Sequence, residues 1–108
     1  MKQSINGFRY DTEKAIRVFD YSFGNAGDFR RQDFSVYRSQ RGHWFIAGSG
    51  GPLTRFARPA GDNSWRGGSR IIPLSPEDVL DLAEQVQDDV DVDQVFDFPE
   101  IVPLLEYA

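Results

Sequence analysis

The sequence predicts an α+β protein: a small antiparallel β-sheet formed by about residues 5–74, with C-terminal acidic helices packed on it. Two strand-like stretches flank a polar turn near residue 40, a strong helix start stands at Ser75, and the charge changes sign at that same residue. The 108 residues, 40% hydrophobic and 14% aromatic, suffice for one domain with a packed core. We divide this single domain, 1–108, into a β-rich part, 1–74, and an acidic helical part, 75–108.

The N-terminal segment predicts a hairpin and then a longer strand. Residues 6–7 are Asn-Gly, a pair typical of type I′ hairpin turns. Residues 8–10 alternate aromatic and basic side chains, as in a half-buried strand. Residues 11–15 suit a turn or one helical turn, and the β-branched and aromatic side chains of 16–23 favour a strand. A helix over 12–19 is the alternative, because its apolar residues also fit a helical stripe.

The next segment contains the clearest β signal. Phe34–Arg38 and His43–Ala47 read as two strands joined by the polar turn Ser39–Gly42. Gly48–Pro52, rich in glycine, is expected to break the second strand.

The segment up to the charge boundary has weaker signals. Residues 53–57 suit a short strand or a helical turn, and 59–68 read as a loop that holds Trp65. Residues 70–74 predict a short strand, and Pro73 places it at a sheet edge or a strand end.

The best-defined helix begins after Ser75. Serine is a preferred N-cap, Pro76 suits the first helical position, and acidic residues follow at the positive end of the helix dipole. The apolar residues repeat at helical spacing and predict a core-facing stripe: Val79, Leu82, Ala83, Val86 and Val90.

A second short helix is expected from Asp91 to Phe96, because Gln94 stands three residues after Asp91 as in a capping box. Residues 99–108 are rich in apolar side chains and are expected to dock on the rest of the protein.

Charge is distributed very unevenly along the chain. Residues 1–74 hold all twelve basic side chains and six acidic ones, whereas 75–108 hold eleven acidic side chains and no basic one. Three interpretations remain open. The acids form a solvated face that pairs loosely with the arginine-bearing sheet, they dock on a basic partner, or they imitate a nucleic-acid backbone. The candidate partner-binding residues are Glu77, Asp78, Asp81, Glu84, Asp88, Asp89, Asp91, Asp93 and Asp97.

The sequence contains no complete motif for catalysis, metal binding or cofactor binding. The sequence contains one histidine, His43, but no nucleophile-elbow pattern whose serine it could activate as a general base. The glycines of 48–51 lack the lysine of a phosphate-binding loop. The aspartates of 88–93 lack the glycine and glutamate of a calcium loop. We therefore expect no enzyme, no catalytic residue, no metal and no cofactor.

The cellular compartment that we expect is inferred from features that the sequence lacks. It contains no cysteine, and no secretory signal or apolar run of membrane-spanning length is found. We expect a cytoplasmic protein without a membrane partner.

Several motifs together resemble small proteins from phages, plasmids and other mobile elements of bacteria. The likeness covers about residues 5–87. It rests on residues 7–15 (GFRYDTEKA), 33–38 (DFSVYR), 44–55 (WFIAGSGGPLTR), 61–65 (GDNSW) and 71–75 (IIPLS). Some such proteins resemble the accessory proteins among which anti-CRISPR inhibitors are found. The resemblance implies a protein of a bacterial host cell that inhibits a defence complex by direct binding, and it carries over no functional residue.

The functional hypothesis is therefore a non-enzymatic inhibitor whose acidic segment blocks a basic, nucleic-acid-binding surface of a protein complex such as a CRISPR effector. The alternative is a nucleic-acid-binding module that uses the arginines interleaved with aromatic residues. The sequence argues against direct nucleic-acid binding, because the net charge is −5 and the acidic tail could screen the arginines.

Overall fold

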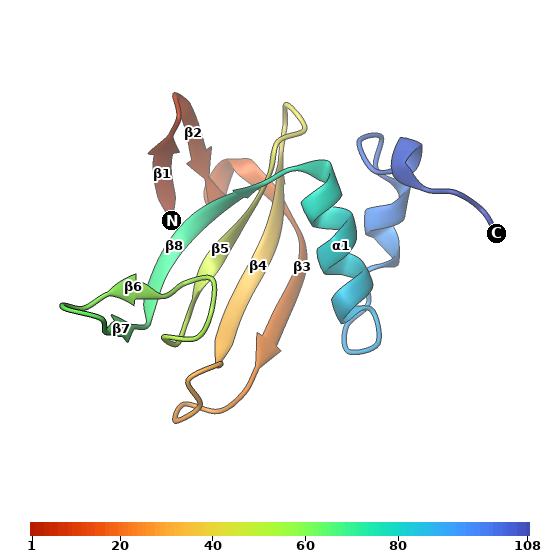
Figure 1. Cartoon of the computed structure of the whole chain (residues 1–108). Coiled ribbons are helices and arrows are strands. Elements are labelled where there is room, and N and C mark those ends of the chain that lie inside the picture. Colours follow the sequence, from red (N-terminus) through yellow and green to blue (C-terminus); the bar gives the residue numbers. More distant parts are fainter.

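A computed structural model describes all residues, 1–108, and shows an antiparallel sheet with one α-helix packed on one face (Figure 1). The main sheet has four strands in the order β3-β4-β5-β8. Their bounds are Ala15–Phe23 for β3, Gln32–Ser39 for β4, Trp44–Gly50 for β5 and Gly68–Leu74 for β8. The chain is thus an α+β protein with a mainly antiparallel sheet, as the sequence predicts.

Two small hairpins flank the main sheet on the side away from the helix (Figure 1). The first pairs β1 (Lys2–Ile5) with β2 (Phe8–Asp11), and the second pairs β6 (Arg58–Pro59) with β7 (Trp65–Arg66). Asn6 and Gly7 turn the first hairpin with φ of 51° and 83°, the two positive values that a type I′ turn needs. The second hairpin lies where the sequence predicted only a loop.

Residues 12–23 form a turn and a strand, so the alternative helix over 12–19 is wrong. A short 3-10 turn, η1 (Thr12–Lys14), leads into β3. A β-bulge between Arg17 and Phe19 shifts the register of β3 against β4. The bulge explains why the consecutive residues Val18 and Phe19 are both buried, since neighbours in a regular strand point to opposite faces.

The second strand of the central hairpin does not break at Gly48, as the sequence predicted, but continues to Gly50. The glycine is needed there for a close approach of the backbone. A Cβ at position 48 would lie 2.6 Å from the Cα of Phe34 in β4, and one at position 50 would lie 2.9 Å from the Phe56 ring. The chain leaves the sheet only after Gly50.

The helix α1 (Pro76–Val86) begins as predicted. The hydroxyl of Ser75 accepts a hydrogen bond from the backbone N–H of Asp78, and the Asp78 carboxylate accepts one from the N–H of Ser75. This reciprocal pair is a capping box. The predicted apolar stripe is buried at Val79, Leu82, Ala83 and Val86, while Val90 is half-buried in the following turn.

The second helix, expected from Asp91 to Phe96, is not confirmed as an α-helix. The chain forms a short 3-10 helix there, η2 (Asp93–Asp97), and another, η3 (Val102–Leu104), further on. Asp91 accepts a bond from the N–H of Asp93, only two residues on, and the Gln94 side chain donates to the carbonyl of Val18 on β3. No capping box can therefore form between Asp91 and Gln94. The acidic layer is one α-helix followed by two short turns.

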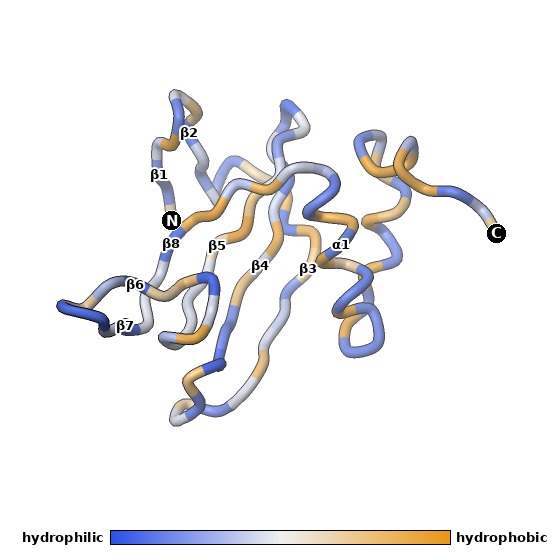
Figure 2. The backbone as a smooth tube through the Cα atoms, viewed as in Figure 1, coloured by the Kyte–Doolittle hydropathy of each residue, from blue (hydrophilic) through white to orange (hydrophobic).

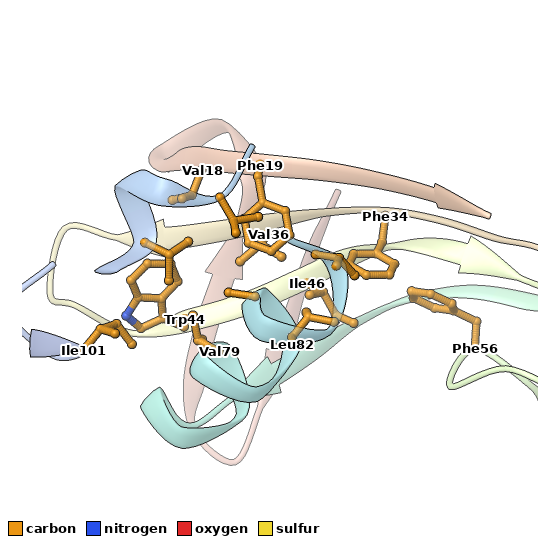
Figure 3. Close-up of a cluster of buried hydrophobic side chains, with 14 residues drawn as sticks. Val18, Phe19, Phe34, Val36, Trp44, Ile46, Phe56, Val79, Leu82 and Ile101 are labelled. Atoms are coloured by element: carbon orange, nitrogen blue, oxygen red, sulfur yellow. The ribbon is translucent and has the colours of Figure 1, made fainter. Parts of the chain in front are cut away.

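The core fills the space between the sheet and this helical layer. Figure 3 shows Val79 and Leu82 of α1 against Trp44 and Ile46 of β5, within a cluster of fourteen buried side chains. In Figure 2 the hydrophobic segments follow the central strands, and the tip of the β6–β7 hairpin is hydrophilic. The predicted docking of the C-terminus holds for Ile101, which is buried, but Tyr107 is 96% exposed.

The first hairpin covers part of the opposite face of the sheet. The Tyr10 ring lies 5.2 Å from that of Phe45, edge to face, and the two residues form a second cluster with Ile71. The side-chain oxygen of Gln3 accepts a hydrogen bond from the N–H of Ile71 on the outer edge of β8. This contact ties the N-terminus to the sheet. None of the helices is long and apolar enough to cross a membrane.

Candidate functional site

Three carboxylates line the solvent side of α1, and a fourth, Asp88, lies in the turn that follows it. Glu77, Asp81, Glu84 and Asp88 follow one another at intervals of four, three and four residues, and all four are exposed. Residues at this spacing share one helix face. At a rise of 1.5 Å per residue, the part of the row on α1, from Glu77 to Glu84, is about 10 Å long. The buried stripe of the same helix points to the sheet, so the core holds this row in place.

The chain after α1 extends the row with further exposed acids. Asp89, Asp91, Asp93 and Asp97 are exposed, whereas Val92 and Val95 between them are buried in the core. The buried valines anchor the backbone and leave the carboxylates in solvent. We call the nine predicted residues together the acidic surface: Glu77, Asp78, Asp81, Glu84, Asp88, Asp89, Asp91, Asp93 and Asp97. All nine are exposed.

None of the nine carboxylates has a basic partner. The molecule contains three ion pairs, Arg17–Asp20, Arg31–Asp33 and Arg38–Glu100, and no residue of the acidic surface takes part in them. Two of the nine accept hydrogen bonds from the backbone, Asp78 in the helix cap and Asp91 at the start of η2. The interpretation that the acids pair with the arginine-bearing sheet therefore holds for Glu100 alone.

Glu100 joins the helical layer to the sheet. Its two oxygens accept hydrogen bonds from Arg38 Nε at 2.6 Å and Nη2 at 2.8 Å, and Oε1 also accepts one from Trp44 Nε1 at 2.8 Å. The Phe98 ring closes this site, 5.1 Å from the Trp44 ring and 5.2 Å from the Arg38 guanidinium carbon. The hydrogen bond from Arg38 lowers the pKa of Glu100, against the opposing effect of burial, and raises the pKa of Arg38.

The sequence analysis counted Glu100 only as one of the eleven acids of residues 75–108 and did not single out its pairing with Arg38. The only local signal of its different role is its position between Phe98 and Ile101, in a segment rich in apolar residues. The carboxylate's partners lie 56 and 62 residues away along the chain, so the pairing appears only in the folded protein.

A second charged region lies at the other end of the main sheet. The residues paired at that end are Phe23, Gln32, Gly50 and Gly68, and the loops 24–31 and 51–57 and the β6–β7 hairpin extend from it. We call this region the arginine end, after Arg30, Arg55, Arg58, Arg66 and Arg70. None of these five arginines forms an ion pair.

His43 lines a hollow of the surface that lies at neither charged region. The hollow, of about 770 Å³, opens between the first hairpin and the β4–β5 turn, and its lining includes Arg9, Arg41 and His43. The exposed His43 ring packs against Phe8 with a centroid distance of 4.8 Å. No three histidine, aspartate or glutamate side chains meet anywhere as a group that could hold a metal ion.

Comparison with known proteins gives no relative: the chain matches no protein-family model, no curated protein and no solved structure.

Proposed function

We propose that this protein is a non-enzymatic inhibitor that docks its acidic surface on a basic, nucleic-acid-binding surface of another protein. The observation that carries the proposal is the set of nine exposed carboxylates without a basic partner on one well-packed layer. Charged groups that have no partner within the molecule remain available to an oppositely charged protein. Complementary charge of this kind speeds association and selects partners.

The spacing of the acids suits a site that normally receives phosphates. Along the row on α1 the carboxylates rise by about 4.5–6 Å from one to the next. A DNA strand carries a phosphate every ~3.4 Å along its axis, so the carboxylate row is a sparser array of negative charge with a spacing of the same order. A groove lined with lysine and arginine would accept either array. The protein would then inhibit by occupying the groove.

The class of target is a bacterial defence complex such as a CRISPR effector. The resemblance of residues 5–87 to small proteins of mobile elements supports this choice. An effector that holds nucleic acid in a positively charged channel presents the surface that the acidic row would fit.

The test is a competition assay with a matched pair of variants. Guide-loaded CRISPR effector complexes of several types are mixed with labelled target DNA, and the inhibitor is titrated in. We expect wild type to displace DNA from at least one of them. Glu84→Gln/Asp88→Asn should raise the inhibition constant about tenfold, with a weaker dependence on salt.

The matched control is Glu13→Gln/Asp62→Asn, which makes the same two chemical changes at exposed acids without ion pairs outside the acidic surface. It should inhibit like wild type. Equal inhibition by the two double variants would remove the acidic surface from the mechanism. Failure of wild type to displace DNA from any effector would remove the proposed target class.

A further inference from the structure

The arginine end exposes aromatic and aliphatic side chains beside its guanidinium groups. Phe29 is 66% exposed, Trp65 60% and Leu53 59%, and Phe23, in the last residue pair of β3 with β4, is 45% exposed. Exposed apolar side chains that gather in one region, unlike those scattered singly, mark interaction sites. The core cannot use them, because they stand on the loops and the small hairpin that project beyond the sheet.

Three arginines of this end, Arg55, Arg58 and Arg70, are held in place but not neutralised. Arg58 Nη2 donates to the carbonyl of Ser69 at 2.9 Å, and Arg70 Nη2 donates to the carbonyl of Arg55 at 2.8 Å. Arg55 itself lies over the Phe34 ring at 5.1 Å. Carbonyls and rings orient a guanidinium and leave its positive charge intact.

Local acids offset part of this charge: with Arg31 included, six arginines of this end stand against Asp28, Asp33 and Asp62, so the net charge is about +3. Asp33 pairs with Arg31, and Asp28 accepts a hydrogen bond from the backbone N–H of Arg30. The acidic tail does not fold over this end either, because its one ion pair with the sheet is at Arg38 near the opposite end. The sequence-based objection that the tail screens the arginines therefore does not hold in the folded protein.

We propose that the arginine end binds single-stranded nucleic acid, with unpaired bases stacked on Trp65 and Phe29 and phosphates contacted by Arg30, Arg58 and Arg66. Positive charge alone would suit any polyanion, but exposed aromatic faces add a stacking surface that only unpaired bases can use. A shallow hollow of about 510 Å³ lies beside Phe29 and Arg31, and five of its twelve lining residues are glycines.

The test measures fluorescence anisotropy of labelled oligo-dT and oligo-U of about 20 nucleotides in about 20 mM NaCl. Binding should be seen with both, and a duplex of equal length should bind more weakly. Trp65→Ala should weaken binding about tenfold, whereas Trp65→Phe, which keeps an aromatic face, should stay within about threefold of wild type.

A matched pair of arginine variants locates the site. Arg30→Ala/Arg66→Ala should lower the slope of log affinity against log salt by about 1.4, because each lost phosphate contact contributes ~0.7 for a single strand. Arg9→Ala/Arg41→Ala removes two exposed arginines without ion pairs elsewhere and should leave the slope unchanged.

Three outcomes would overturn the proposal: no anisotropy change at low salt, equal effects of the two arginine pairs, or salt-sensitive self-association without oligonucleotide binding. The last outcome, seen by sedimentation and lost in Arg30→Ala/Arg66→Ala, would assign this end to the acidic surface of a second copy. The oligonucleotide assay contains no defence complex, so its result is independent of the proposed inhibition.

Discussion

Gly48 shows how a single residue decides how closely two strands can pack. It lies opposite Phe34, where a Cβ would overlap the carbonyl oxygen of Asp33 and lie 2.6 Å from the Phe34 Cβ. These atoms belong to β4, whose pairing to both neighbours leaves it no room to move. We predict that Gly48→Ala lowers the free energy of unfolding by about 1–3 kcal/mol, measured by urea denaturation.

The matched control is Gly27→Ala in the β3–β4 loop, where an added Cβ would meet nothing within 4 Å. Its free energy of unfolding should stay within about 0.5 kcal/mol of wild type. If Gly48→Ala were equally mild, the strands would have more freedom to separate than the packing indicates.

The same residue shows why the sequence misplaced the end of β5. Glycine is common where strands stop and also where two backbones come close, and the local sequence is the same in both cases. Only the position of β4 in the folded protein shows that Gly48 belongs to a close approach of two strands and not to a strand end. The role of Glu100 could not be predicted for a similar reason, because its partners Arg38 and Trp44 lie far away along the chain.

At the scale of elements, the Arg38–Glu100 pair fastens the segment after α1 to β4. Arg38 lowers the pKa of Glu100 in the folded protein. The ionised Glu100 carboxylate therefore stabilises the folded protein at pH values above the ordinary glutamate pKa of about 4.3. This stabilisation is lost as the pH falls through the lower pKa that Glu100 has in the folded protein. We predict that Glu100→Gln lowers the free energy of unfolding by about 1–3 kcal/mol near neutral pH.

The pH dependence distinguishes this pair from simple packing. The stability gap between wild type and Glu100→Gln should narrow between about pH 5 and pH 3, followed by denaturant unfolding at each pH. Glu106→Gln, an exposed acid without an ion pair, should match wild type throughout. A gap that stayed constant with pH would mean that the shape of the side chain, not its charge, matters at this position.

Elements defined by local signals were predicted well, and those defined by distant contacts were not. Ser75 and Pro76 specify the start of α1 within a few residues, and the turn 39–42 specifies the central hairpin. The segment 91–96 carries similar capping residues, yet Gln94 bonds to Val18 on β3 instead of its own backbone. The competing partner lies 76 residues away, beyond the reach of any local pattern.

For the whole molecule, the main result is that the two signs of charge are separated in space as well as in sequence. The sequence located the boundary at Ser75 but left open whether the acidic tail folds over the arginines. The fold answers this, because β8 ends beside the start of the helical layer and α1 covers one face of the sheet, away from the β6–β7 hairpin (Figure 1). The acidic surface and the arginine end thus lie apart in the folded protein.

Separated like charges repel one another, so we expect the acidic surface to oppose stability. Glu84 has Asp81 and Asp88 at helical spacing, and no basic residue occupies the last turn of α1. Neutralising Glu84 and Asp88 should relieve like-charge pairs and an unfavourable interaction with the helix dipole. We predict that Glu84→Gln/Asp88→Asn raises the free energy of unfolding by about 0.5–1.5 kcal/mol, measured by urea denaturation at low salt.

Added NaCl should raise the stability of wild type more than that of this variant, because salt screens the repulsion that the variant lacks. Glu13→Gln/Asp62→Asn should gain less stability, since these two acids lie in the part of the chain that holds all the basic residues. A variant less stable than wild type would mean that Glu84 and Asp88 help to hold the fold. A variant that is more stable but inhibits less would show that these carboxylates serve binding at the expense of stability, as functional sites commonly do.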